Sequence, residues 1–449
     1  MMQKTILTAL FSLSFLFTLA QEKTFSYIPK NKDSIFSYVT KVNEIKKSKF
    51  DGKYKKEIKE IITERNTDFI KTIKDSNYIF DSKISGYLNK ILGEIYKSNP
   101  DLKTADNYFF ISKSPIPNAA SYGNGIFTVN LGLFNLVQSD DELASILSHE
   151  IAHQTLEHVD KSMLSYIEKI NSKETKKKIK EVTKKEFGKR QAVSDLIKDL
   201  NYNFLRRTRK AESQADSLGL VIFSKTKYKK SASLDALKRL DFVNDMIFNE
   251  PVNLKNHFDF SEYPFKEAWL AKDQNLFDIK ESANDYAMDK DSVKTHPDIP
   301  IRLELLKKFV NEDNSTAQPS SEIQAIKKIA ADNSIEIFMT ESRIDWALYQ
   351  TLLMYNQKQL DEKIYCNNVS QILKKTYEFK NKHLFGKYVG LINGFSDEKN
   401  LDEVKQFLHN IELKSIKKIG LQFCMKYQTV MQNDPDFIKT TEFFTKLNQ

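Results

Sequence analysis

Cysteine is scarce in this chain: 449 residues contain only two, Cys366 and Cys424. Neither lies in a metal-binding or nucleophile motif, so the sequence points to no cysteine chemistry. No cysteine lies near the apolar N-terminal segment, so a bacterial lipid anchor has no attachment residue there. The pair is open to two interpretations, a disulfide, which export would permit, or two buried free thiols.

Long apolar runs are also lacking, with one exception at the N-terminus. Residues 5–19 carry no charge and are mostly apolar, they follow Lys4, and Ala20 offers a small residue at a cleavage point. This pattern predicts a secretory signal peptide over residues 1–20. An uncleaved anchor is the alternative, but about 15 such residues are short for a bilayer span of roughly 20. We therefore expect an exported protein, periplasmic in the first instance, without an integral membrane span.

The charge is biased toward one sign, with 69 Lys and Arg against 60 Asp and Glu, for a net charge of +9. Positive and negative residues are interleaved along helix-like segments, which is typical of solvated, ion-paired helix faces. Together with export, this argues against a nucleic-acid partner, while peripheral contact with an anionic membrane stays open.

Histidine is sparse too, and three of the seven histidines lie within ten residues, in SDDELASILSHEIAHQTLEHVD (residues 139–160). Ser139 and Glu142 have the spacing of a capping box, which predicts that a helix begins there. On that helix His149 and His153 lie one turn apart, with Glu150 beside them. This H-E-x-x-H pattern is typical of zinc hydrolases.

A tetrahedral zinc needs a further protein ligand besides two histidines and a water. The candidate is Glu212, 59 residues beyond His153, on a predicted helix that also carries Asp216 one turn later. Both carboxylates would face the same way, so Glu212 could bind the metal while Asp216 accepts a hydrogen bond from a liganding histidine. Glu150 is then placed to act as general base.

Four blocks in this order resemble the gluzincin metallopeptidases that include HtpX, the Ste-type CaaX prenyl proteases and the periplasmic BepA-like enzymes. The blocks are PNAASYGNGIFTVNLGLF, ELASILSHEIAHQTLEH, RKAESQADSLG and THPDIPIRL. The resemblance implies one Zn²⁺ per chain, bound by His149, His153 and Glu212, with Glu150 as catalytic glutamate. Because the membrane-embedded members carry several transmembrane helices that this chain lacks, the resemblance favours the exported type.

The same resemblance places further residues near the cleft. His296 and Arg302 would contact the reaction intermediate or, for His296, occupy the open zinc position; a structural role for both is the alternative. Asn118 matches the family's segment beside the zinc, as does the strand that includes the residues Gly125, Ile126, Phe127 and Thr128. If that strand is an edge strand, it can bind extended peptide by strand addition; an ordinary interior strand is the alternative.

The predicted fold is α+β and mostly helical, a zincin-type metallopeptidase domain with a small β-sheet followed by a helical domain. The expected segments are a signal peptide (1–20), an N-terminal helical region (21–77), the peptidase domain (78–310), a linker (311–321) and a C-terminal helical domain (322–449). Strands are predicted at 108–112 and 126–130, and a helix at 78–98. The C-terminal helices fit either a degenerate tetratricopeptide-like array or a plain bundle, and the aromatic segment 245–290 fits either a satellite apolar cluster or a lid.

The predicted function is zinc-dependent endopeptidase activity on unfolded or extended polypeptide, including misfolded or unassembled cell-envelope proteins. One alternative is a chaperone-like assembly factor with a self-inhibited zinc site, whose C-terminal helices bind an envelope protein. Another is a zinc hydrolase that acts on a non-peptide substrate.

Overall fold

The computed structural model describes residues 26, 27, 29–102, 107–184, 209–241, 250–271, 299–311, 319–340, 343–390, 392 and 399–449. Helices dominate these ranges and one four-stranded sheet is present, which confirms the α+β, mostly helical class. The predicted signal peptide lies outside the described residues. Among the helices that the structure describes, none is long and apolar enough to cross a membrane.

The sheet consists of β1 (Tyr78–Ile79), β2 (Tyr108–Ser112), β3 (Ala119–Gly123) and β4 (Ile126–Asn130), in the order β1-β2-β4-β3. β4 is parallel to β2 and antiparallel to β3. The hairpin between β3 and β4 turns through Asn124 and Gly125, whose φ angles are 52° and 81°. Such left-handed angles favour an Asn-Gly pair, because these residues tolerate them best.

The predicted strands at 108–112 and 126–130 are confirmed as β2 and β4. The predicted helix at 78–98 begins later, as α3 (Ser82–Ser98), because Asp81 caps it by accepting hydrogen bonds from the amides of Lys83 and Ile84. The preceding Tyr78 and Ile79 pair with β2 instead. β3 was not predicted, because the small residues of AASYG carry no strand signal of their own.

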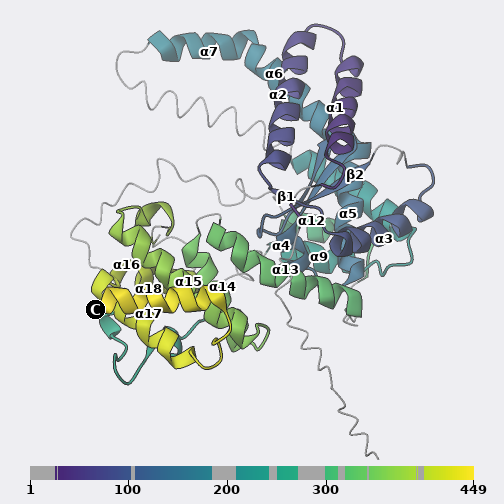
Figure 1. The fold of residues 1–449 in the computed structure, drawn as a ribbon. Coiled ribbons are helices and arrows are strands. Elements are labelled where there is room, and N and C mark those ends of the chain that lie inside the picture. Colours follow the sequence, from purple (N-terminus) through teal and green to yellow (C-terminus); the bar gives the residue numbers. More distant parts are fainter. Residues whose placement is uncertain are drawn as a thin grey trace, which may run out of the picture.

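Two helical layers cover the two faces of the sheet (Figure 1). Phe127 and Val129 of β4 pack into the core formed with α3 and α5 (Asp140–Thr155). Phe110 and Ile126 face the other way and pack against α1 (Lys32–Lys49) and α2 (Lys55–Lys74). The core that includes Phe127 and Val129 therefore lies between the sheet and α5, and it fixes the buried side of α5 against the sheet.

The remaining elements complete the chain. They are α4 (Leu131–Leu136), α6 (His158–Asn171), α7 (Lys173–Lys184), a helix over residues 209–224, α9 (Ala232–Asp241), α11 (Leu254–Phe258), η1 (Glu267–Leu270), α12 (Ile299–Leu306), α13 (Ser321–Thr340), α14 (Ile344–Asn356), α15 (Glu362–Asn381), η3 (Phe385–Lys387), α16 (Lys399–Asn410), α17 (Leu413–Tyr427) and α18 (Pro435–Asn448).

The C-terminal helices α14–α18 share one apolar core, and residues 250–271 belong to it. Phe258 stacks on Phe407 of α16 with ring centroids 5.1 Å apart, and Trp269 packs against the same ring. The described part of the aromatic segment is therefore neither a satellite cluster nor a lid, because its side chains are buried among these helices.

Two buried cysteines lie in the same core. Cys366 and Cys424 are both free thiols, so the free-thiol interpretation holds and the disulfide interpretation does not. Burial raises the pKa of each thiol to about 12. Both therefore stay protonated and unreactive at neutral pH.

Helix α13 joins the two cores. Ile323, Ile326 and Ala330 pack into the core between the sheet and α5, while Ile335 and Phe338 pack into the C-terminal core. Asn135 of α4 donates a hydrogen bond to Ser334 at 3.2 Å. A single helix thus contributes side chains to both hydrophobic clusters.

Candidate metal centre

Helix α5 begins as the capping pattern predicts. The amide of Glu142 donates to the Ser139 hydroxyl at 3.1 Å. The reciprocal bond differs, because the Glu142 carboxylate accepts from the Gln138 amide at 2.8 Å and from Arg239 of α9 at 3.0 Å. The start of α5 is therefore tied both to its own backbone and to a neighbouring helix.

Three potential metal ligands converge at the C-terminal half of this helix. The Nε2 atoms of His149 and His153 lie 3.0 Å apart. A Glu212 oxygen lies 3.5 Å from His149 Nε2, and the other lies 3.2 Å from His153 Nε2. The structure thus brings together three side chains that the sequence separates by up to 63 positions.

The spacing of these atoms fits zinc. Ligand atoms about 2.0–2.1 Å from a tetrahedral zinc stand roughly 3.3 Å from one another. The three observed separations, 3.0, 3.2 and 3.5 Å, bracket that value. Two imidazoles and a carboxylate are also a donor set that zinc uses in catalytic sites.

Asp216 and Arg302 contact two of these ligands, His149 and Glu212, and hold them in position. An Asp216 oxygen accepts a hydrogen bond from Nδ1 of His149 at 3.0 Å, which leaves Nε2 of that ring facing the other ligands. Arg302 of α12 donates two bonds to Asp216, at 2.6 and 2.7 Å, and its Nη1 lies 2.8 Å from Glu212. The Arg302 side chain is only 4% exposed, so the cation is buried with the carboxylates that it pairs.

These contacts set the charge of the site. Burial alone would lower the pKa of His149, but its hydrogen bonds to Asp216 and Glu212 outweigh burial and raise that pKa to about 10. Burial alone would raise the pKa of Asp216, but Arg302 and His149 hold it at about 2. At both groups, hydrogen bonds and neighbouring charges therefore outweigh the effect of burial.

Glu150 lies beside the three ligands with one oxygen held and one unpaired. Its Oε2 accepts a hydrogen bond from the backbone amide of Ser121 in β3 at 2.9 Å. Its Oε1 is buried and has no hydrogen-bond partner among the described residues. A carboxylate oxygen kept unpaired in a buried site is costly, and it is the arrangement expected of a group that must take up a proton.

Of the two interpretations of the strand that includes Gly125, Ile126, Phe127 and Thr128, the interior strand holds and the edge strand does not. β4 is paired on both sides, with β2 and with β3, so its backbone has no unpaired edge. Asn118 lies just before β3, and its carbonyl accepts a hydrogen bond from the Asn130 amide at 2.9 Å, which closes the hairpin. The strand at the edge of the sheet beside Glu150 is β3.

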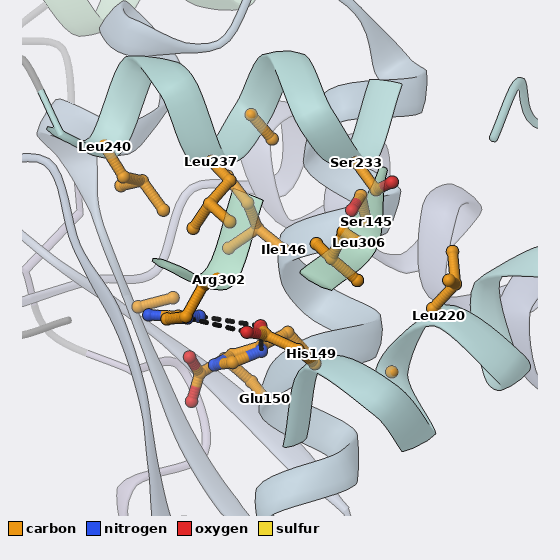
Figure 2. A pocket seen from close by; sticks show the side chains of 14 residues that line it. Ser145, Ile146, His149, Glu150, Leu220, Ser233, Leu237, Leu240, Arg302 and Leu306 are labelled. Atoms are coloured by element: carbon orange, nitrogen blue, oxygen red, sulfur yellow. Dashed lines mark hydrogen bonds and ion pairs between the residues drawn. The ribbon is translucent and has the colours of Figure 1, made fainter. Parts of the chain in front are cut away.

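A pocket of about 40 Å³ opens between Glu150, Arg302 and α9 (Figure 2). Figure 2 shows Ile146 and Leu237 at its apolar wall, with Arg302 pointing toward the side of His149. Leu306 of α12 also lines it. The pocket is thus apolar at its base and charged at the end that meets the candidate metal ligands.

The helix over residues 209–224 crosses α5 at close range, and Gly219 permits this. A Cβ at position 219 would lie 2.9 Å from the His149 Cα, against backbone that cannot rotate away. We expect Gly219→Ala to lower the free energy of unfolding by about 1–3 kcal/mol through overpacking, measured by urea denaturation.

Gly93 of α3 supplies the matched control for this prediction. A Cβ there would meet nothing within 4 Å, so Gly93→Ala should stabilise the protein by up to about 1 kcal/mol through helix propensity. If Gly219→Ala were as stable as Gly93→Ala, the close approach of the two helices would be refuted.

Two further residues, His296 and Arg302, were predicted to lie near the site. His296 lies outside the described residues. Arg302 lies at the site, paired to acids. Two contacts had no role in the sequence-based prediction. The first is the Ser121 amide, for which the sequence offers no signal, because any residue except proline can donate a backbone hydrogen bond. The second is His158, which the sequence could have indicated, because it lies in the same cluster of histidines as His149 and His153.

The region that contains these residues is similar to known proteins. The profile of peptidase family M48 matches residues 84–310, just over half of the chain. The beta-barrel assembly-enhancing proteases of Yersinia pestis and Escherichia coli K12 are 27% and 28% identical to it over 85 residues, or 19% of this chain and 17% of each relative. A Vibrio cholerae protein provisionally given the same name is 36% identical over 85 residues, again 17% of its length. The chain belongs to peptidase family M48.

Proposed function

We propose that this chain is a zinc-dependent endopeptidase with one zinc ion per chain, held by His149, His153 and Glu212. The observation that carries the proposal is the convergence of these three donors beside the unpaired oxygen of Glu150. Hydrolase families with H-E-x-x-H use this constellation to cleave peptide bonds. Membership of family M48 supports the same reaction class.

The residues of the chain divide the work of hydrolysis. Zinc, when bound, supplies a Lewis acid that polarises the scissile carbonyl and activates water. Glu150 takes a proton from the attacking water and returns it to the leaving amine. The Ser121 amide keeps one Glu150 oxygen in place, so that Oε1 is the oxygen that accepts the proton. Asp216 and Arg302 orient His149 and Glu212.

The pocket beside Glu150 suits a small aliphatic side chain of the substrate. Its apolar base is formed by Ile146, Leu237 and Leu306, and its volume is about 40 Å³. A substrate residue placed there would lie next to the scissile bond. Cleavage sites mapped by mass spectrometry should be enriched in Ala, Val or Leu on one side, whereas cleavage beside charged residues would contradict this assignment.

We further propose that the substrates are misfolded or unassembled proteins of the cell envelope. The relatives named above are beta-barrel assembly-enhancing proteases, and residues 1–20 have the pattern of an export signal. Fractionation of cells that express the full chain tests the location. Recovery in the cytoplasm would overturn it.

Metal removal tests the central proposal. Treatment of the purified full chain with a chelator should abolish cleavage of unfolded casein, and one equivalent of Zn²⁺ should restore it, because the His₂Glu donor set prefers zinc to Mg²⁺. Mg²⁺ is the matched control and should restore nothing. Cleavage that persists in the metal-free protein, or a purified chain that binds no zinc, would overturn the proposal.

A further inference from the structure

His158, the first residue of α6, lies directly behind the candidate metal ligand His153. The two Nδ1 atoms are 2.9 Å apart, which is hydrogen-bond distance, and the rings meet edge to face with centroids 5.0 Å apart. His158 is only 7% exposed. A contact this short between buried rings requires one nitrogen to donate and the other to accept.

The position of His153 decides which nitrogen donates. Its Nε2 faces His149 and Glu212, so a metal would bind there. When Nε2 is the ligand atom, the proton of a neutral imidazole must lie on Nδ1. The Nδ1–H of His153 therefore donates to Nδ1 of His158.

The second nitrogen of His158 completes the chain of contacts. Its Nε2 lies 3.3 Å from Oε1 of Gln214, an acceptor, so the His158 proton lies on Nε2 and donates to Gln214. Gln214 belongs to the helix over residues 209–224, which also supplies Glu212 and Asp216. Each histidine ligand is thus tied through its Nδ1 to that same helix, His149 directly and His153 through His158.

The local backbone is bent to make this contact. Glu157, between α5 and α6, has a φ of 55°, a left-handed conformation that is unfavourable for a non-glycine residue. The bend at Glu157 turns the chain after the end of α5. His158, the next residue, therefore lies against His153. Local strain that is retained beside a functional site is typical of a geometry that the site needs.

We infer that His158 is a positioning residue for zinc binding: it holds the His153 ring in the tautomer and orientation that present Nε2 to the metal, and Gln214 fixes His158 in turn. The inference rests on the proposed zinc site but assigns a role to a residue outside it. Contacts of this kind behind a metal ligand change metal affinity about 10–100-fold when they are removed.

The test measures metal affinity and not turnover. The Zn²⁺ dissociation constant of the full chain is determined by competition with a chromogenic chelator, and the visible spectrum of the Co²⁺-substituted protein reports ligand geometry. His158→Phe keeps the ring but cannot accept the His153 proton, so it should weaken Zn²⁺ binding about 10–100-fold. His158→Gln retains an acceptor oxygen and should recover part of that loss. Gln214→Leu should give a smaller loss in the same direction.

His257 offers a matched control, because it is a histidine of similar burial, 5% exposed, bonded to Tyr365 in the C-terminal core. His257→Phe should leave Zn²⁺ affinity and the Co²⁺ spectrum unchanged. Wild-type affinity in His158→Phe would overturn the inference while leaving the zinc site itself intact, and if His158→Phe does not fold, wild-type affinity in Gln214→Leu would do so. If the wild type binds no zinc, the proposed function fails instead.

Discussion

Replacement of Glu150 by Gln is expected to abolish peptide hydrolysis while zinc stays bound at one ion per chain. Gln has the shape of Glu and its carbonyl oxygen can still accept from the Ser121 amide, but it cannot take a proton from water. General-base catalysis contributes about 10²–10⁴-fold, so the kcat for casein should fall by at least about 100-fold. Metal content and kcat are measured on the same preparation.

The same substitution should not lower stability. Glu150 is 3% exposed and its Oε1 has no partner among the described residues, so removal of its charge relieves a desolvation cost. Glu168→Gln, an equivalent change at an exposed position of α6, is the control for both measurements and should alter neither. A Glu150→Gln protein that retains more than about a tenth of wild-type kcat would show that another group is the base.

The second large effect is expected for Arg302→Leu, measured as the free energy of unfolding of the metal-free protein. Arg302 pairs with Asp216 through two hydrogen bonds and with Glu212 through a third nitrogen. Its loss leaves two buried carboxylates with His149 as their nearest compensating charge. Breaking a buried ion pair by removing one partner costs about 3–5 kcal/mol, so the urea midpoint should shift by a corresponding amount.

Lys307→Leu is the matched control, because Lys307 pairs with Glu304 at 3.3 Å close by in the chain and the side chain is 38% exposed. Exposed pairs of this kind contribute about 0–1 kcal/mol. Addition of Zn²⁺ should recover part of the stability of Arg302→Leu, since the cation compensates Glu212. If Arg302→Leu lowered the free energy of unfolding of the metal-free protein by less than about 1 kcal/mol, the charges of the buried carboxylates would have to be neutralised in some other way.

Local sequence patterns were sufficient to predict a structural feature wherever the contacts that determine it join residues close together in the chain. The cap at Ser139 and the turn at Asn124 follow from residues three positions apart or fewer. The positions of His149, Glu150 and His153 on one side of a helix follow from helical geometry alone. The strands at 108–112 and 126–130 followed from their β-branched and aromatic composition.

Long-range pairing decided what these patterns could not. AASYG becomes β3 because β4 lies beside it, and that pairing makes β4 an interior strand and β3 the edge beside Glu150. Residues 250–271 joined the C-terminal core because Phe258 and Trp269 find an apolar surface on α16, far along the chain. Neither segment carries a periodic pattern in its sequence from which this outcome could be predicted.

The sequence by itself determined the helical character of the chain, the helix that carries H-E-x-x-H and the chemical identity of the candidate ligands, because residue type and short spacing carry that information. Tertiary structure alone decided that Arg302 pairs with Asp216 and Glu212, that the Ser121 amide holds Glu150, and that His158 lies behind His153. These contacts depend on how separate elements cross, at distances where one ångström separates a hydrogen bond from none. Such precision comes from packing of the whole core and cannot be derived from any one segment.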